Sequence, residues 1–339
     1  MRLAADADLA PFNTLRIPAR ARVMAQVDHW YEIERVLSDP RLRDLPCLVL
    51  GEGSNVLFRD DYPGLVLRIA NRGRDVLDVG ADGRVLVRVA AGENWHGLVL
   101  WTASRGLWGI ENLALIPGTC GAAPIQNIGA YGAQLSDSLV SVRALDRTRG
   151  TWRDFDAQAC RLGYRTSRFR EDPDNRWCIT EILLALETDG RPRLGYPGVA
   201  ASLDALEAET IGPADMAAAI SGIRQRKLPN PRVTPNCGSF FKNPVVAAAT
   251  AEQLRGRSPS CPCHPAGEGL VKLSAAWLID QCGLKGQRVG GAAVSDRHAL
   301  VLINSGGATG KDVWQLALDV QARVFDRFGI RLEPEPQIV

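Results

Sequence analysis

No apolar run in this sequence approaches the roughly 18 residues that a membrane-spanning helix needs. The start of the chain, Met1 to Ala10, also lacks the basic and then apolar layout of a signal peptide. We therefore expect a protein that has no membrane partner and stays in the cytoplasm.

Lysine is scarce, because only five of the 40 basic residues are Lys and the others are Arg. Against 38 acidic residues they leave a net charge of +2, and no segment gathers positive charge into a stripe that could follow a nucleic-acid backbone. Nucleic acid is therefore not an expected partner. Because Arg is so common here, a single Arg is weak evidence for a site, and the surrounding motif has to decide.

The eight cysteines show no framework of regular spacing, which favours free thiols in a reducing compartment over disulfides. One cluster contains Cys261, Cys263 and His264. Its one-residue gap is tighter than the spacing usual for zinc ligands, and Ser, Pro and Gly surround it. We therefore predict a surface loop and no metal site.

Hydrophobic residues make up 46% and charged residues 23% of the chain, which is typical of a folded globular protein. A length of 339 residues allows two or three domains with a real core. Hydrophobic periodicity predicts strands and helices along the whole chain. The strands are expected at residues 21–27, 47–50, 65–69, 85–90, 139–145, 179–186, 299–303 and 330–339, and the helices at residues 29–37, 95–105, 214–223, 275–281 and 313–329.

A glycine turn follows the strand at residues 47–50 and reads Gly51-Glu52-Gly53-Ser54-Asn55-Val56-Leu57. Consecutive backbone N–H groups in such a turn can form an anion-binding nest for a diphosphate. The turn is not a Rossmann fingerprint, because Val56 stands where the third glycine belongs and no helix follows. An anion nest and an ordinary tight hairpin explain it equally well.

A second glycine-rich segment, residues 116–132, is rich in small and apolar residues. Small residues let the backbone approach a bulky ligand, and the amides of Gln126 and Asn127 can donate hydrogen bonds to it. Long ordered loops are often functional, so this segment favours ligand binding. A third segment, residues 306–312, is one residue too short for a P-loop and has Asp312 in place of the Mg²⁺-binding Ser or Thr. It predicts a helix start capped by Thr309 or Asp312.

Seven motifs occur in order along the chain: GEGSNVLF, the segment from IPG to GAYG, CRLGYRTSRF, KLPNPRV, CGSFFKNP, KLSAAWLIDQCGLKG and LEPE. From Asn13 to Glu335 their order and spacing resemble the UDP-N-acetylenolpyruvoylglucosamine reductases, the MurB family. The resemblance implies an α+β fold class, a three-domain flavoenzyme with a vanillyl-alcohol-oxidase-type FAD-binding fold and a C-terminal substrate-binding domain. The implied domains are residues 1–70 joined by the C-terminal strand 330–339, residues 71–212, and residues 213–329 for the UDP-sugar.

The resemblance also implies non-covalent FAD, NADPH as hydride donor, and UDP-N-acetylglucosamine enolpyruvate as substrate. The product would be UDP-N-acetylmuramate, made by a monomeric enzyme of peptidoglycan precursor synthesis. The implied flavin-binding residues lie in the two glycine-rich segments and one later strand. They are Gly51, Gly53, Ser54, Asn55, Val56, Leu57, Pro117, Gly118, Gly121, Ala122, Gln126, Asn127, Gly129, Ala130, Tyr131 and Ile179.

Reduction of an enolpyruvyl ether needs hydride at the terminal vinyl carbon and a proton at the carbon that bears the carboxylate. Negative charge builds up on that carboxylate in between, and a nearby cation stabilises it. The resemblance assigns the cation to Arg165, the proton donor to Ser239 and an assisting acid to Glu335. Without it, these residues would be interpreted as a surface arginine, a turn cap and a solvated strand-end charge.

Other matched positions concern the substrate. Arg224, Lys227 and Asn243 match residues around its diphosphate and uridine, His298 and Tyr164 match residues near it, and Tyr196 matches the loop tyrosine of the longer family form. One departure is Pro336, which stands where the family usually has valine. Because proline removes a ladder hydrogen bond, the geometry of Glu335 is the assignment most open to change.

Two rival functions fit parts of the sequence. An FAD-dependent oxidase on the same fold would be marked by a covalent flavin link, for which Cys120 is a candidate, and would leave the third-domain motifs unexplained. A flavin- or UDP-sugar-binding regulator without turnover would not need Arg165, Ser239 and Glu335 together.

Overall fold

The computed structural model describes residues 1–79, 83–196, 198–204 and 210–339, which form two compact units. The N-terminal unit contains Met1–Ala7, Ala21–Glu52 and Pro63–Arg226, and the C-terminal unit contains Asp8–Arg20, Gly53–Tyr62 and Lys227–Val339. Two early segments of the chain therefore belong to the C-terminal unit. The division into residues 1–70 with 330–339, 71–212 and 213–329 stays a prediction.

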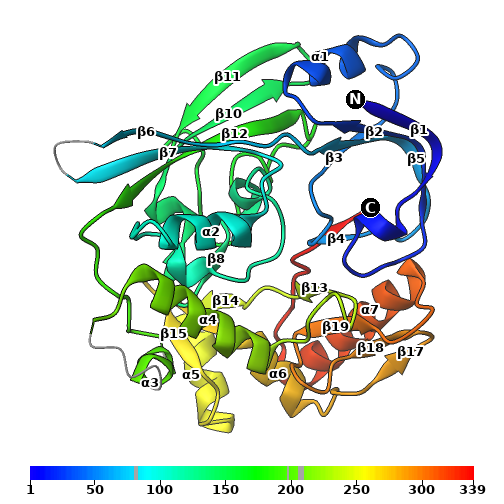
Figure 1. The fold of residues 1–339 in the computed structure, drawn as a ribbon. Helices are drawn as coiled ribbons and strands as arrows, with labels where there is room; N and C mark the ends of the chain where they lie inside the picture. Colours follow the sequence, from blue (N-terminus) through cyan, green and yellow to red (C-terminus); the bar gives the residue numbers. More distant parts are fainter. Residues whose placement is uncertain (80–82, 197, 205–209) are drawn as a thin grey trace. The chain divides into compact units, whose positions relative to one another are not determined.

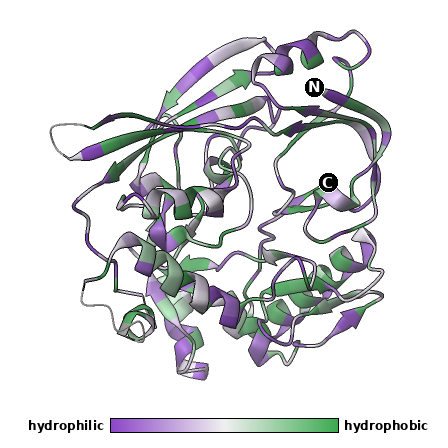
Figure 2. Ribbon diagram, in the orientation of Figure 1, coloured by the Kyte–Doolittle hydropathy of each residue, from purple (hydrophilic) through white to green (hydrophobic). Residues whose placement is uncertain are grey.

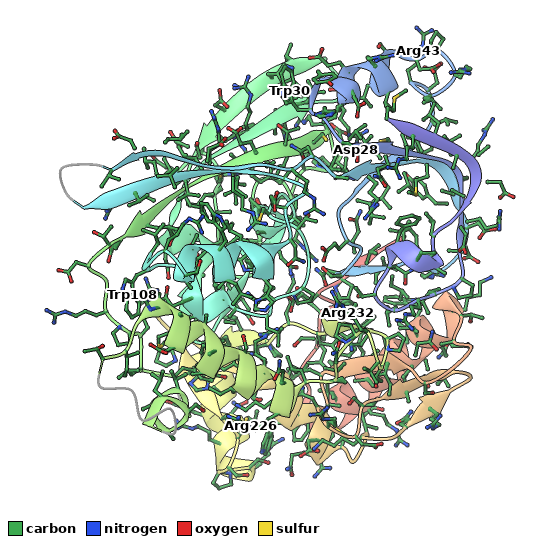
Figure 3. All side chains as sticks on the ribbon, in the orientation of Figure 1. Asp28, Trp30, Arg43, Trp108, Arg226 and Arg232 are labelled. Atoms are coloured by element: carbon green, nitrogen blue, oxygen red, sulfur yellow. The ribbon has the colours of Figure 1, made fainter. Side chains whose placement is uncertain are left out.

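A four-stranded sheet in the N-terminal unit has the order β1-β2-β5-β3 (Figure 1). Its strands are β1 (Arg2–Asp8), β2 (Arg20–Val27), β3 (Cys47–Leu50) and β5 (Tyr62–Ile69), and β3 pairs with β5 in parallel. Helix α1 (Tyr31–Ser38) buries Ile33 and Val36. Trp30, just before α1, is 52% exposed and meets Trp152 edge-on, with 5.4 Å between ring centroids (Figure 3). The predicted β-α-β start is confirmed.

The second sheet of this unit is a five-stranded antiparallel sheet with the order β11-β10-β12-β7-β6. In β7 the buried residues Val85, Val87 and Val89 alternate with more exposed ones, and Figure 2 shows both hydrophobic and hydrophilic residues along the strands of this sheet. This period of two is typical of a sheet with one buried face. The strands are β6 (Arg74–Val79), β7 (Arg84–Ala90), β10 (Leu139–Asp146), β11 (Thr151–Asp156) and β12 (Trp177–Glu187).

Helix α2 (Trp95–Ala103) follows β7, and the side chain of Asn94 caps it by accepting a hydrogen bond of 2.8 Å from the Gly97 N–H. Between α2 and β10 the chain, which includes the glycine-rich segment at residues 116–132, forms only short elements. They are η2 (Glu111–Leu113), η3 (Ala123–Gln126), β8 (Gly129–Ala130), β9 (Ala133–Gln134) and η4 (Leu135–Asp137). Helices α3 (Val199–Asp204) and α4 (Pro213–Lys227) come next, and α4 begins at Pro213 as predicted.

The C-terminal unit contains a sheet of order β13-β19-β18-β17, a sheet of order β14-β16-β15, and a parallel pair of β20 with β4. The strands are β4 (Val56–Leu57), β13 (Asn236–Ser239), β14 (Val245–Ala247), β15 (Cys263–Pro265), β16 (Leu270–Leu273), β17 (Arg288–Val289), β18 (Ala292–Val294), β19 (Val301–Asn304) and β20 (Gln337–Ile338). The other elements are η1 (Ala10–Phe12), α5 (Ala248–Arg257), α6 (Ala275–Gln281) and α7 (Gly310–Phe328).

Helix α7 packs on the sheet of order β13-β19-β18-β17 and buries Val313, Leu316, Val320 and Val324, as its spacing predicts. Thr309 and Asp312 form a capping box at its start, so the glycine-rich segment at residues 306–312 is a helix cap. Gly329 ends the helix with a left-handed φ of 69°.

The cysteine cluster differs from its prediction. Cys263 and His264 lie in β15 and pair with β16, so the segment is a short strand, and the predicted surface loop is wrong there. Cys261 is buried in the hydrophobic core of the C-terminal unit. No group of three or more His, Cys, Asp or Glu that could hold a metal ion occurs in the described part of the chain. Within the same residues, no helix is both long and apolar enough to cross a bilayer.

Candidate flavin and substrate site

The glycine-rich segment of the N-terminal unit runs along the end of β7 and the start of α2. Backbone hydrogen bonds join Gly121 N–H to the Ala91 carbonyl at 2.8 Å and Trp95 N–H to the Gly118 carbonyl at 3.0 Å. A Cβ at Gly121 would lie 2.5 Å from the Ala91 Cβ, so only glycine fits at this contact. The segment is therefore an ordered backbone wall built of small residues.

Glu52 joins the two glycine-rich segments. Its Oε1 accepts a hydrogen bond of 2.9 Å from Asn94 Nδ2, and its Oε2 accepts one of 3.2 Å from the Gly118 N–H. A Cβ at Gly51 would lie 2.5 Å from Thr119 Oγ1, so Gly51 is needed for the same close approach. Sequence reasoning missed Glu52, although the residue stands inside the first glycine motif.

Four side-chain hydrogen bonds join the loop at residues 125–129 to the segment at residues 163–170, which carries Arg165. Ser167 Oγ donates to the Ile125 carbonyl at 2.6 Å, and Arg170 Nη1 donates to Gln126 Oε1 at 3.1 Å. Asn127 Nδ2 donates to the Gly163 carbonyl at 3.2 Å, and Arg165 Nη2 donates to the Gly129 carbonyl at 2.9 Å. We call these four bonds the Arg165 clamp.

Asn127 therefore has a local role. Its Oδ1 also accepts a hydrogen bond of 3.0 Å from the Ser136 N–H, and its φ of 46° is one that Asn tolerates better than most residues. Both ends of this amide contact protein groups. Its predicted contact with flavin stays a prediction.

Several non-glycine residues around the clamp have left-handed backbone. They are Leu115 (φ 59°), Asn127 (φ 46°), Tyr131 (φ 50°) and Arg165 (φ 55°). A bulky residue in this region is strained and persists only where its surroundings hold it, and such strain gathers at functional sites. The positive φ values therefore indicate that the Tyr131 and Arg165 segments are functional, independently of their sequence motifs.

Two tyrosines and an arginine form a second group in the N-terminal unit. Tyr131 and Tyr196 pack edge-on with 4.8 Å between ring centroids. Burial raises the pKa of Tyr131, against an opposing effect of Arg224, and burial lowers the pKa of the Arg224 guanidinium. Arg224 Nε is buried and has no hydrogen-bond partner among the described residues. The group offers a hydroxyl-rich, cationic surface suited to an anionic ligand.

Two further predicted residues of this unit are Tyr164, which precedes Arg165 in the chain, and Ile179, which lies in the five-stranded sheet. The Arg165 guanidinium lies over the ring of Tyr164 at 5.5 Å, and Tyr164 is 41% exposed. Ile179 is buried in β12, where it pairs with Ala144.

In the C-terminal unit, the end of the chain pairs with the segment that follows Ser239. The Glu335 N–H donates to the Phe240 carbonyl at 2.8 Å, and the Lys242 N–H donates to the Glu333 carbonyl at 2.9 Å. Ser239 itself pairs with Val301 of β19. Burial, and to a smaller extent the negative charge of Glu335, raise the pKa of the Cys237 thiol to about 12. The structure therefore brings Ser239 and Glu335 together on neighbouring segments.

Pro336 leaves this pairing intact. The residues on either side of it both donate backbone hydrogen bonds, Glu335 to Phe240 at 2.8 Å and Gln337 to the Asn55 carbonyl at 3.0 Å. Asn55 Nδ2 also donates to the Glu335 carbonyl at 3.3 Å. The expected disturbance of Glu335 by proline is therefore not found, because the missing N–H falls between the two bonds that hold the chain end. The strand predicted at residues 330–339 is wrong in extent, since only Gln337–Ile338 form one and Glu335 lies before it.

Gly53 anchors the first glycine motif in the same unit. Its φ is 62°, and a Cβ there would lie 2.1 Å from the Phe12 carbonyl oxygen, so glycine is required on both counts. Val56 and Leu57 continue into the parallel pair with β20. The motif is thus neither a two-strand hairpin nor a strand-to-helix turn.

The other predicted substrate residues of the C-terminal unit are partly engaged. Asn243 Oδ1 accepts a hydrogen bond of 3.0 Å from the Ala275 N–H at the start of α6. His298 Nδ1 accepts one of 3.3 Å from the Leu300 N–H. Burial and then the charges of Lys227 and Lys285 lower the pKa of His298, so its imidazole is a neutral donor at neutral pH.

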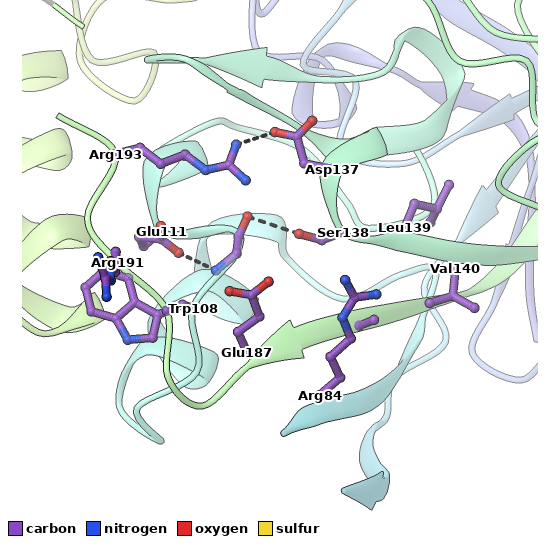
Figure 4. A pocket seen from close by; sticks show the side chains of 13 residues that line it. Arg84, Trp108, Glu111, Asp137, Ser138, Leu139, Val140, Glu187, Arg191 and Arg193 are labelled. Atoms are coloured by element: carbon purple, nitrogen blue, oxygen red, sulfur yellow. Dashed lines mark hydrogen bonds and ion pairs between the residues drawn. The ribbon is translucent and has the colours of Figure 1, made fainter. Parts of the chain in front are cut away.

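A polar pocket in the N-terminal unit contains none of the predicted residues (Figure 4). Its lining pairs Arg193 with Asp137, and Glu111 accepts a hydrogen bond of 2.6 Å from the Gly109 N–H. Burial raises the pKa of Glu111. Arginines and carboxylates are balanced here, so the pocket has no marked preference for an ion of either sign.

Comparison with known proteins identifies two domain families in the chain. The FAD binding domain family matches residues 21–156, and the UDP-N-acetylenolpyruvoylglucosamine reductase C-terminal domain matches residues 230–339. The fold and the first match define an FAD-containing oxidoreductase, and the predicted α+β fold class is confirmed.

Full-length relatives give the family. UDP-N-acetylenolpyruvoylglucosamine reductase of Burkholderia vietnamiensis is 48% identical over 338 residues, covering 99% of this chain and 97% of the relative. That of Pseudomonas aeruginosa is 47% identical, covering 100% and 99%. A crystal structure of the Thermus caldophilus reductase superposes with a TM-score of 0.69 at 26% identity, covering 99% of this chain and 98% of that chain. The chain belongs to the UDP-N-acetylenolpyruvoylglucosamine reductase family.

We predict that Glu52→Gln weakens FAD binding about tenfold, because hydrogen bonds to a charged group contribute roughly 1.5–3 kcal/mol. The new amide would face either the Gly118 N–H or Asn94 Nδ2, both donors, and Asn94 cannot rotate because its Oδ1 already caps α2. The FAD dissociation constant of the apoprotein, measured by flavin fluorescence, tests this. Glu187→Gln, an exposed carboxylate in the same unit, is the control, and equal affinities for both variants would contradict the role of Glu52.

Proposed function

We propose that this chain reduces the enolpyruvyl group of UDP-N-acetylglucosamine enolpyruvate to give UDP-N-acetylmuramate, a step in peptidoglycan precursor synthesis. FAD is the bound cofactor and NADPH is the hydride donor. The observation that carries the proposal is the pairing of the chain end with the Ser239 segment. Glu335 is hydrogen-bonded through its backbone to Phe240, which follows Ser239 in the chain. Ser239 and Glu335 match the positions of the family's proton donor and acid.

The residues present fit FAD. Gly51 and Gly121 stand where a Cβ would lie 2.5 Å from its neighbour, and Gly53 has a φ of 62°. Such backbone, with no side chains in the way, suits the close approach of a dinucleotide. The glycine motif from Gly51 to Leu57, the segment from Pro117 to Tyr131 and Ile179 would hold it. When bound, FAD supplies the hydride that it receives from NADPH.

Arg165 is proposed to bind the carboxylate of the enolpyruvyl group. A guanidinium can hold both carboxylate oxygens and stabilise the negative charge as it grows. The Arg165 clamp fixes the backbone on both sides of this residue, and Nη2 of its side chain is anchored on the Gly129 carbonyl at 2.9 Å. A fixed cation costs little reorganisation during reaction, which is what makes it effective.

Ser239 is proposed to deliver the proton to the carbon that bears the carboxylate, and Glu335 to assist as an acid near the developing charge. Ser239 is half-buried in β13, and its neighbour Phe240 is held by hydrogen bonds to Leu300 and Glu335 at 2.7 and 2.8 Å. This double support fixes the backbone beside Ser239, because the strand cannot shift without breaking both bonds.

The substrate's diphosphate and uridine are proposed to bind Arg224, Lys227, Asn243 and His298, with Tyr164 and Tyr196 also contacting the substrate. The half-buried Arg224 supports this, because its buried Nε, which has no hydrogen-bond partner among the described residues, gains one when an anion arrives. The division into three domains, the monomeric state and the cytoplasmic location stay predictions.

The oxidase alternative is disfavoured by Cys120. This residue is fully buried, and burial raises the pKa of its thiol well above its usual range. A thiol that is not ionised is a poor nucleophile for a covalent flavin link.

We predict that Ser239→Ala slows substrate reduction by roughly 10²–10⁴-fold and leaves the reduction of flavin by NADPH within about twofold, since only substrate reduction needs the proton donor. Stopped-flow absorbance resolves the two half-reactions. Ser305→Ala, at the end of neighbouring β19, serves as the control and should change neither rate. Equal slowing of both half-reactions by Ser239→Ala would make Ser239 a structural residue.

Glu335→Gln is expected to impair only transfer to the substrate, because neither flavin reduction nor binding develops the charge that the acid stabilises. Glu333→Gln is the matched control, since the Glu333 side chain is 74% exposed and pairs with Lys242 at 3.2 Å. Surface substitutions of this kind change stability by about 0.5 kcal/mol or less. Single-turnover kinetics of both variants decide. Loss of substrate reduction in Glu333→Gln, with normal rates in Glu335→Gln, would assign the acid to Glu333.

A further inference from the structure

Asn112 is a fully buried amide in η2, outside every motif that the family resemblance assigns. Its Nδ2 donates two hydrogen bonds to backbone carbonyls. One goes to Tyr131 at 2.8 Å and the other to Arg193 at 3.3 Å. These acceptors lie 19 and 81 residues away in sequence, so a single side chain joins two distant segments.

The first segment is strained. Tyr131 and Gly132 join β8 to β9 with φ values of 50° and 79°, the pattern of a two-residue type I′ turn. Asn, Asp and Gly dominate these positions because they tolerate positive φ, whereas a tyrosine there is costly. A strained residue persists only where other contacts fix it, and the Asn112 bond to the Tyr131 carbonyl is such a contact.

The second segment leads to Tyr196, three residues after Arg193. It is tied to the same hairpin a second time, because the Arg193 guanidinium pairs with Asp137 (Figure 4). The Asp137 carboxylate also accepts a hydrogen bond of 3.2 Å from the Gln134 N–H in β9. Backbone and side chain of Arg193 are thus both fixed relative to the turn that carries Tyr131.

The orientation of the Asn112 amide is determined by these contacts. Its Oδ1 is buried and has no hydrogen-bond partner within the described ranges. Rotating the amide would satisfy nothing and would place Oδ1 against two carbonyl oxygens. Leaving a buried acceptor unmatched costs about 1–3 kcal/mol, which a residue serving stability alone would not need to incur.

We propose that Asn112 is a positioning residue that holds Tyr131 and Tyr196 in their edge-on pair, ready for the UDP-sugar. The inference rests on the proposed function, in which Tyr196 contacts the substrate. Asn112 acts only through the two carbonyls and touches no reacting group. Its loss should therefore loosen the tyrosine pair and weaken substrate binding, without changing the chemistry that follows.

The test is Asn112→Leu, which keeps the branching and the number of side-chain heavy atoms and removes both donors. We expect the KM for the UDP-sugar to rise about fivefold to tenfold, as the loss of a buried hydrogen-bond donor suggests, with kcat and the rate of flavin reduction by NADPH within about twofold. Asn304→Leu is the control. It removes a buried amide that donates to the Leu15 carbonyl at 3.0 Å in the C-terminal unit, and it should lower stability while leaving KM unchanged.

Asn112→Asp provides a second variant, because it differs by one polar group and also lacks the N–H donors. A raised KM with normal kcat in either folded variant supports the proposal. A wild-type KM in every folded variant overturns it, and so does failure of both variants to give folded holoprotein, because Asn112 would then be structural. Failure of the proposed function itself looks different, since wild-type protein reduced by NADPH would then not be reoxidised by the UDP-sugar.

Discussion

The Arg165 clamp is the constraint on which the arrangement of the N-terminal unit depends. Four hydrogen bonds of 2.6 to 3.2 Å fix the loop at residues 125–129 against the segment at residues 163–170. They hold both segments in backbone conformations that isolated chains avoid, with φ values of 46° at Asn127 and 55° at Arg165. The role proposed for Arg165, to meet a growing negative charge, needs this rigidity, because reorganisation during reaction would reduce the effect of the cation.

In the C-terminal unit, backbone hydrogen bonds hold the segment that carries Glu335 in a fixed position. The chain end is held on one side by Phe240 and on the other by Asn55, so Glu335 sits between two anchors. Asn55 belongs to the first glycine motif, so its hydrogen bonds join that motif directly to the segment that carries Glu335. Pro336 is tolerated because the two backbone N–H groups that hold the chain end belong to Glu335 and Gln337, on either side of it.

The sequence alone predicts long elements well and long-range contacts poorly. The periodic helix that ends at Gly329 and the strand β7 are found as expected, because the hydrophobic pattern of each is complete within a short stretch of consecutive residues. Strands such as β13, with four residues, and β15, with three, are too short for a pattern to show. The motifs single out Arg165 and Ser239, but Glu52 and Asn112 act through partners 66 and 81 residues away, which no local pattern reveals.

The central claim is that one bound flavin passes reducing equivalents from NADPH to an enolpyruvyl UDP-sugar. The most direct measurement is the visible absorption spectrum of the purified holoprotein under nitrogen. NADPH should bleach the oxidised flavin band, and UDP-N-acetylglucosamine enolpyruvate should restore it while one equivalent of UDP-N-acetylmuramate forms. UDP-N-acetylglucosamine, which lacks the vinyl group, should leave the band bleached. A reduced flavin that the enolpyruvyl sugar cannot reoxidise, and that only oxygen restores, would contradict the account.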